Sequence, residues 1–158
     1  MLLASGWFGP RDGEVAAFGV KIEWTESEIE KARAMSHRPA PAFATREEAT
    51  ERYLRISGLA GLADASSATA VAGVLGDDGR FQVAMDPRAY GAVGPSIVAL
   101  LRLATAPLRL AAGDRDPMVT LEQMRRVDPA ARVFPGVGHN AHWEAPDQVW
   151  SFVAVGAR

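Results

Sequence analysis

The sequence predicts an α/β protein, a helical region followed by a short parallel strand–helix–strand–helix arm. Two observations lead to this prediction. Apolar runs over residues 107–112 and 131–134 are separated by a segment with helical spacing, and such alternation favours parallel strands with helices packed on them. Before residue 94 the pattern differs, because amphipathic segments with capping residues follow one another between proline and glycine breaks.

The helical region is predicted to cover residues 21–93. Two of its helices begin at a capping box, in which a threonine hydroxyl and the glutamate three residues later satisfy free backbone amides reciprocally. The expected elements are a helix from Thr25 to about Met35, a helix from Thr45 to Gly58, a helix over residues 62–72, and two extended arms over residues 74–83 around an Asp-Asp-Gly turn.

The arm is predicted to cover residues 94–158. We expect its two strands to be adjacent and parallel, with a helix over residues 120–128 crossing between them, because such crossovers have a strong right-handed preference. The other helices of the arm are expected from Gly94-Pro95 to Leu103 and from Pro146 onward, the last with Val149, Phe152 and Val153 facing inward.

Carboxylates follow the first of the two predicted strands, and a histidine follows the second. Asp116 comes three residues after Gly113 at the end of the first strand, and His139 follows Gly138 on the loop after the second. Because sites in open α/β sheets form at the carboxyl ends of the strands, we expect Asp116 and His139 to lie within hydrogen-bonding distance. Asp114 is the alternative acid, although beside Arg115 it is more typical of a solvated turn residue.

These motifs, in this order, resemble the C-terminal arm of the α/β-hydrolase family. The resemblance covers somewhat more than a third of the chain. It implies an incomplete α/β-hydrolase fold, with residues 94–158 as the core arm, residues 21–93 as the helical cap, and residues 1–20 as a lead-in with a candidate core strand at Met1 to Ala4. The residues that carry it are Pro107 leading the strand, Gly113-x-x-Asp116 at its end, Gly138-His139, and Glu144-x-Pro146 opening the last helix.

By this resemblance, His139 is the general base of a Ser-Asp-His triad and Asp116 is the carboxylate that orients it. A serine hydroxyl is too weak an acid to ionise unaided, so an imidazole takes its proton and returns it to the leaving group. The family's nucleophile lies in a Gly-x-Ser-x-Gly elbow, and no serine before Asp116 has this pattern. Ser96 supplies half of it and is predicted to be a first-turn helix residue. The oxyanion-hole donors of the elbow are missing as well.

The remaining histidines and two tryptophans are expected to have structural roles. His142 is predicted to pack or to form a pocket wall. His37, next to Arg38-Pro39, is predicted to end a helix, where the negative end of the helix dipole favours it. Trp143 and Trp150 are predicted to pack in the core or at its margin.

The composition excludes several classes of protein. The chain has 158 residues, of which 48% are hydrophobic and 23% charged, and its net charge is −2, so it lacks the basic footprint of a nucleic-acid or anionic-membrane binder. The absence of cysteine excludes disulfides, thiolate nucleophiles and cysteine-based zinc sites. No apolar run approaches the roughly 20 residues that span a bilayer. We therefore expect a cytoplasmic protein that uses no cofactor or metal and binds a small-molecule substrate or ligand.

Two functions follow from these observations. In the first, the chain is a fragment of an ester- or acyl-bond hydrolase that contributes the acid and the base and is inactive alone. An upstream segment or a complementing chain would then add the nucleophile at the open sheet edge, which an unpaired strand leaves available. In the alternative, the chain is a catalytically inactive remnant that binds a small molecule under its cap or forms a homodimer through that edge.

Overall fold

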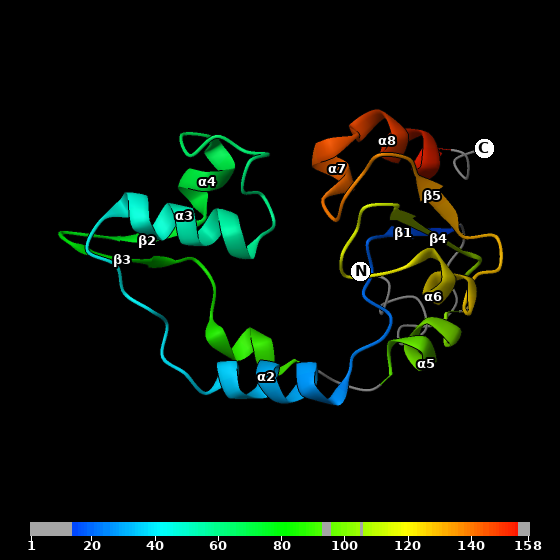
Figure 1. Ribbon diagram of the computed structural model, residues 1–158, viewed down its shortest axis with the longest axis horizontal. Coiled ribbons are helices and arrows are strands. Elements are labelled where there is room, and N and C mark those ends of the chain that lie inside the picture. The colour runs from blue at the N-terminus through cyan, green and yellow to red at the C-terminus, as the bar shows by residue number, and fades with distance from the viewer. Residues whose placement is uncertain (1–13, 93–95, 105, 155–158) are drawn as a thin grey trace. The chain divides into compact units, whose positions relative to one another are not determined.

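The computed structural model describes residues 14–92, 96–104 and 106–154. These residues form two compact units (Figure 1), one from residues 1–24 and 94–158 and the other from residues 25–93. We call them the sheet unit and the helical unit. The candidate strand at Met1 to Ala4 lies outside the described residues.

The described part of the sheet unit is built on three parallel strands in the order β1-β4-β5. They are β1 (Val15–Phe18), β4 (Leu108–Gly113) and β5 (Arg132–Phe134). The prediction that the two strands of the arm are adjacent and parallel is confirmed, since Ala112 of β4 pairs with Val133 of β5. The third strand, β1, lies in the lead-in, where no strand was predicted at these residues, and it pairs with the other side of β4.

Helices cover both faces of this sheet, as a parallel sheet requires. Alternate residues of β4 point to opposite faces: Leu110 belongs to one apolar cluster and Ala111 to another, and both are fully buried. The first cluster includes Leu101 of α5 (Ile97–Arg102) and Met124 of α6 (Leu121–Arg125). The second includes Ala141 of α7 (Ala141–Glu144) and Phe152 of α8 (Pro146–Ala154).

Polar side chains fasten the strands to the elements beside them. The Arg109 guanidinium on β4 donates to the carbonyls of Phe152 (2.6 Å) and Val153 (3.4 Å) in the last turn of α8, where carbonyls lack helical partners. Its Nε lies 2.9 Å from Oε2 of Glu14. On the other side of β4, the amide of Leu110 donates to Asp128 at 2.8 Å, beyond the point where β5 pairs with the strand.

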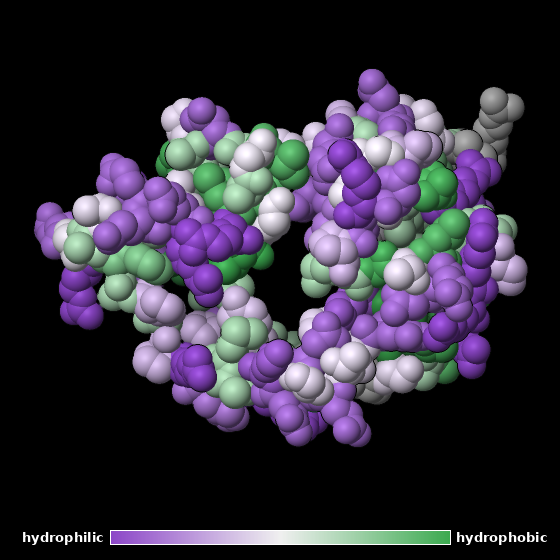
Figure 2. Space-filling view, viewed as in Figure 1, coloured by the Kyte–Doolittle hydropathy of each residue, from purple (hydrophilic) through white to green (hydrophobic). Residues whose placement is uncertain are grey.

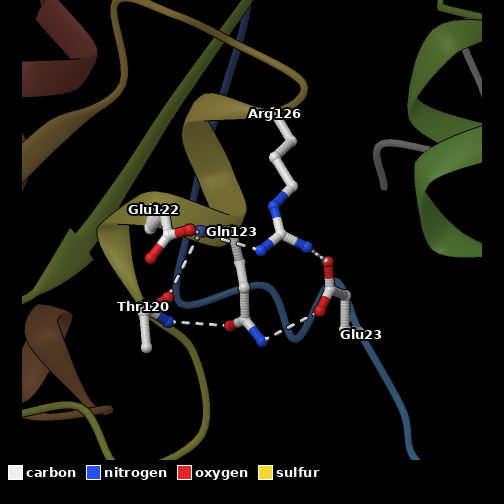
Figure 3. Close-up of polar contacts among 5 residues, drawn as sticks. All are labelled: Glu23, Thr120, Glu122, Gln123 and Arg126. Atoms are coloured by element: carbon white, nitrogen blue, oxygen red, sulfur yellow. Dashed lines mark hydrogen bonds and ion pairs between the residues drawn. The ribbon is translucent and has the colours of Figure 1, made fainter.

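A second polar network ties the segment that leaves β1 to α6 (Figure 3). Thr120 and Gln123 form a capping box, with the Gln123 amide donating to Thr120 Oγ1 at 3.2 Å and the Thr120 amide donating to Gln123 Oε1 at 2.9 Å. The Gln123 side chain also donates to Glu23 at 3.3 Å, and Arg126 forms an ion pair with the same carboxylate. Figure 3 shows Glu23 reaching both residues, so one carboxylate holds this segment against α6.

The described residues of the helical unit form four helical elements and one hairpin. Both predicted capping boxes are present, at Thr25 and at Thr45, and Leu54, Leu59 and Ala70 form a small buried cluster. The elements are α2 (Glu26–Ser36), α3 (Arg46–Ile56), α4 (Ala68–Ala72), β2 (Val74–Asp77), β3 (Arg80–Val83) and the 3-10 helix η1 (Pro87–Gly91). The turn between the strands places Asp78 (φ 44°) and Gly79 (φ 78°) in the left-handed region, which the Asp-Gly pair tolerates.

Three expectations about these elements are wrong. The helix predicted over residues 62–72 begins only at Ala68, because Ser67 caps it and Asp64 accepts bonds from the amide and hydroxyl of Ser66 in a turn before it. On α8 Val153 does not face inward, since it is 40% exposed. Trp150 is not packed, being 72% exposed, whereas Trp143, 38% exposed, is excluded from the core but not from its margin.

Among the described residues, no helix combines the length and apolar character needed to cross a lipid bilayer.

Candidate active site

Asp116 is held in the turn that follows β4. Its backbone amide donates to the carbonyl of Gly113 at 3.3 Å, and its Oδ1 accepts from the amide of Met118 at 2.8 Å. The side chain has no solvent exposure. A buried carboxylate needs hydrogen-bond partners for its oxygens. Because the backbone holds Oδ1, the orientation of the whole carboxylate is fixed, and with it the position of Oδ2.

His139 supplies the partner of that second oxygen. Its Nδ1 lies 3.0 Å from Asp116 Oδ2. A carboxylate facing Nδ1 favours the tautomer that carries its proton there, which leaves Nε2 as a proton acceptor. The imidazole is 34% exposed, so a reactant can reach it. The structure thus brings Asp116 and His139 together at the carboxyl ends of β4 and β5, as expected, while their catalytic role remains a prediction.

The loop that carries His139 is fastened at three consecutive positions. The Gly136 amide donates to Asp114 Oδ1 at 2.8 Å, the Val137 carbonyl accepts from the Arg115 amide at 3.0 Å, and the Gly138 amide donates to Glu144 at 2.8 Å. The Arg115 guanidinium also donates to the Gly136 carbonyl. These bonds fix the backbone on the N-terminal side of His139, so the ring is oriented before any ligand binds.

Both glycines of the site have close neighbours, and at Gly113 the neighbour is backbone, which requires glycine. A Cβ at Gly113 would lie 2.0 Å from the Val137 carbonyl oxygen and 2.5 Å from that of Gly138. A Cβ at Gly138 would lie 2.8 Å from a carboxylate oxygen of Glu144. Gly113 therefore allows the Asp116 turn and the His139 loop to pack directly against each other, whereas Gly138 lies against the carboxylate of Glu144.

Asp114 does not face the imidazole. Its carboxylate accepts from the Gly136 amide, and the residue is exposed. The alternative acid therefore holds the backbone of the histidine loop in place, whereas Asp116 contacts the ring.

The other candidate residues lie in structural positions. Ser96 is the N-cap of α5, where its hydroxyl accepts from the Ala99 amide at 3.4 Å, so the expectation of a first-turn position is wrong by one residue. His37 is the C-cap of α2, as predicted. His142 lies against the Phe18 ring, with the ring centroids 6.2 Å apart. Within the described ranges, no group of three or more His, Cys, Asp or Glu side chains is arranged to hold a metal ion.

Sequence reasoning missed the part played by Glu144 and Asp114 in the site. Glu144 was noted only as part of the motif that opens the last helix, yet its carboxylate reaches back six residues to the Gly138 amide. Glu144 lies in α7, the short helix that returns its carboxylate toward the loop, and this helix was not predicted from the sequence. The sequence gives no signal for Asp114 either, because its partner lies 22 residues away.

Comparison with known proteins bears on the fold. No family model and no curated protein matches the sequence significantly. The crystal structure of E-2-(acetamidomethylene)succinate hydrolase is similar with a TM-score of 0.71 and 15% identity, over 99% of this chain and 61% of that one. An esterase from Mycobacterium tuberculosis is similar with a TM-score of 0.62 and 15% identity, over 90% of this chain and 53% of that one. An α/β hydrolase from Novosphingobium aromaticivorans is similar with a TM-score of 0.59 and 18% identity, over 98% of this chain and 59% of that one.

The fold is therefore that of the α/β-hydrolases, in incomplete form. The chain spans about three fifths of the length of the solved hydrolases that it resembles. At these low identities the likeness establishes the fold, and the function of the site has to be argued from its residues.

Proposed function

We propose that this chain supplies the acid and the base of an ester- or acyl-bond hydrolase, with His139 as general base and Asp116 as the residue that orients it. The observation that carries the proposal is the 3.0 Å contact between His139 Nδ1 and the fully buried Asp116 carboxylate. The esterase and hydrolase names of the similar structures support the same class of reaction. In this proposal residues 21–93 are the helical cap.

The geometry matches the proton transfers of acyl hydrolysis. His139 Nε2 removes the proton from a hydroxyl nucleophile as it attacks the carbonyl carbon of the ester, and the resulting imidazolium returns that proton to the leaving alcohol. Asp116 remains ionised throughout, keeps Nδ1 protonated and stabilises the imidazolium. A water molecule activated by the same imidazole then releases the acid from the nucleophile.

We assign the nucleophile to polypeptide that adds to the open edge of β1. The amides of Val15 and Gly19 donate toward β4, to Pro107 and Ala111. Strand residues alternate in direction, so the amides of Ala16 and Phe18 face away from β4, where no described strand pairs with them. An unpaired edge of a parallel sheet is a template for a further strand. The similar structures are longer than this chain, which supports a partner segment that continues the sheet.

A complementation experiment tests this proposal. The full chain is mixed with, or fused behind, the polypeptide encoded upstream of Met1, and hydrolysis of a p-nitrophenyl ester and labelling by a serine-directed fluorophosphonate are followed. The chain alone should give neither signal, because an acid–base pair without its nucleophile and oxyanion donors lacks the main sources of the rate enhancement. The completed protein should give both.

Variants of the completed protein assign the roles. His139→Ala should abolish turnover, and Asp116→Asn should lower kcat by about 10⁴, the order found when the orienting acid of a triad is replaced by its amide. Asp147→Asn, an exposed first-turn residue of α8, serves as the matched control and should leave kcat unchanged. Undiminished turnover by His139→Ala would disprove the proposed role of the pair.

A further inference from the structure

A pocket of about 170 Å³ lies wholly within the helical unit, where the end of α2, the loop that follows it, α3 and the segment between β3 and η1 meet. Its wall is largely apolar, formed among others by Phe43, Ile56 and Met85. Figure 2 shows hydrophobic and weakly hydrophilic side chains together around the left end of α2, with strongly hydrophilic ones beside them. The pocket is thus largely apolar.

Two arginines and a tyrosine supply the polar groups of this pocket. Arg38 lies in the loop after α2, and Arg52 lies on α3, one turn before Ile56. Within the part of the chain that the structure describes, neither guanidinium forms an ion pair or hydrogen bond, and no acidic residue lines the pocket. Arg52 is half-buried, as is Tyr90, whose ring also lines the pocket.

The carboxylate of Asp86, next to the lining residue Pro87, is already engaged. Both of its oxygens accept from the Arg88 guanidinium, with an ion-pair distance of 2.5 Å. It also accepts from the Arg88 backbone amide at 2.9 Å. The two positive charges at the pocket are therefore not neutralised by this neighbour.

We infer that this pocket binds a small apolar monocarboxylate of about six carbons. A neutral apolar occupant would cover Arg52 and leave its charge without water or a partner, which is costly. An anion removes that cost, and a carboxylate fits a guanidinium with two parallel hydrogen bonds. As to size, an apolar cavity of about 150 Å³ holds one benzene molecule, so 170 Å³ suits a six-carbon chain or a single ring.

This inference is independent of the hydrolase proposal, because every lining residue lies between residues 35 and 90 and none belongs to the site of Asp116 and His139. The measurement is therefore direct binding to the full chain, by titration calorimetry and by saturation-transfer NMR, with hexanoate as the probe. Hexan-1-ol and hexylammonium have the same number of carbons, with a neutral and a positive head group. We expect saturable binding of hexanoate, at least tenfold weaker binding of the alcohol, and no binding of the ammonium.

Arginine variants locate the site. Arg52→Gln should weaken hexanoate binding about tenfold, which corresponds to the loss of one charge-assisted hydrogen bond. Arg38→Gln should weaken it about threefold, because the Arg38 side chain is more exposed to solvent. Arg55→Gln is the matched control: it removes an exposed arginine of the same helix that does not line the pocket, and it should leave the affinity unchanged. Thermal melts confirm that each variant is folded.

Three results would overturn the inference, whatever the outcome of the complementation experiment. They are an absence of hexanoate binding to the folded chain, equal affinity for hexanoate and hexan-1-ol, and an Arg55→Gln effect as large as that of Arg52→Gln. Binding of hexanoate with the expected order of variants supports it even if no ester is hydrolysed.

Discussion

Replacing Gly113 by alanine should force apart the two loops that carry Asp116 and His139. The added Cβ would lie 2.0 Å from the Val137 carbonyl oxygen and 2.5 Å from that of Gly138. Both neighbours are backbone atoms, so they cannot rotate away as a flexible side chain would. The Val137 carbonyl must retreat by about 1 Å before even a tight contact is reached, and it accepts the Arg115 amide from the same turn. His139 follows two residues later and must move with it.

The cost follows from this geometry. Inserting a methyl group into a packed region typically destabilises a protein by about 1–3 kcal/mol, and contact with rigid backbone on two atoms places this substitution at about 3 kcal/mol. For a chain of this length each kcal/mol lowers the melting temperature by about 2–4 °C, so we expect a decrease of about 6–12 °C. Separation of Asp116 from His139 should also remove the hydrogen-bonded Nδ1 proton resonance of the imidazole.

Circular dichroism melts and NMR of ¹⁵N-histidine-labelled protein measure the two effects. Gly136→Ala in the same loop is the matched control, because Gly136 has φ 72° and no neighbouring atom lies within 4 Å of the Cβ that alanine would add, so it tests conformational strain without a clash. That strain costs about 1–2 kcal/mol. A decrease at Gly113→Ala no larger than at Gly136→Ala, or an unchanged Nδ1 resonance, would refute the reasoning.

Three further predictions concern the contacts around this unit and the caps of the helices. Glu144→Ala removes the acceptor of the Gly138 amide and should lower the free energy of unfolding by about 1 kcal/mol in urea titrations; a change below a few tenths would show that water replaces the carboxylate fully. Thr45→Ala removes the N-cap of α3 and should cost about 1 kcal/mol, whereas Glu47→Gln, outside the capping box, should cost almost nothing; equal effects would contradict the capping role. Glu23→Gln breaks the exposed pair with Arg126 and should cost at most about 1 kcal/mol, a loss that shrinks in 1 M salt; a salt-independent loss would point to the Gln123 hydrogen bond instead.

Elements whose start is marked by a local signal were predictable from the sequence. The capping boxes at Thr25, Thr45 and Thr120 each begin a helix within one residue of the expected position. In each case the signal and the structure it stabilises lie within four residues, so no distant contact has to be known. The Asp-Asp-Gly turn is of the same kind, since its residues tolerate the left-handed backbone that a tight hairpin requires.

Elements that depend on distant contacts were predicted less well. β1 consists of four residues, and it is a strand because β4, more than 90 residues later, pairs with it. Trp150 was expected to pack but is exposed, because on a helix of nine residues only the face that includes Phe152 meets the sheet, and the sequence pattern does not mark the margin of that face.

The candidate acid–base pair was predictable because its determinants are almost all local to the two strand ends. Gly113 and Gly138 lie where neighbouring groups pack closely, and each precedes a residue of the pair by three positions or fewer. The residues that support the pair could not be predicted. Asp114 and Glu144 accept hydrogen bonds from backbone amides, and the sequence does not indicate which backbone amide a polar side chain will contact.

The supports of the pair also show how much of the site exists before the sheet is completed. The hydrogen bonds that orient Asp116 and fasten residues 136–138 before His139 come from residues 113–144, within β4, β5, the loops after them and α7. Beside the end of β1, the loop has a packing contact at Gly19, where a Cβ would lie 3.2 Å from the His139 carbonyl oxygen. If the chain acts as proposed, a strand added at the far side of β1 would meet an imidazole that is already oriented. Completion of the site would then require a nucleophile and oxyanion donors, and no rearrangement of the histidine.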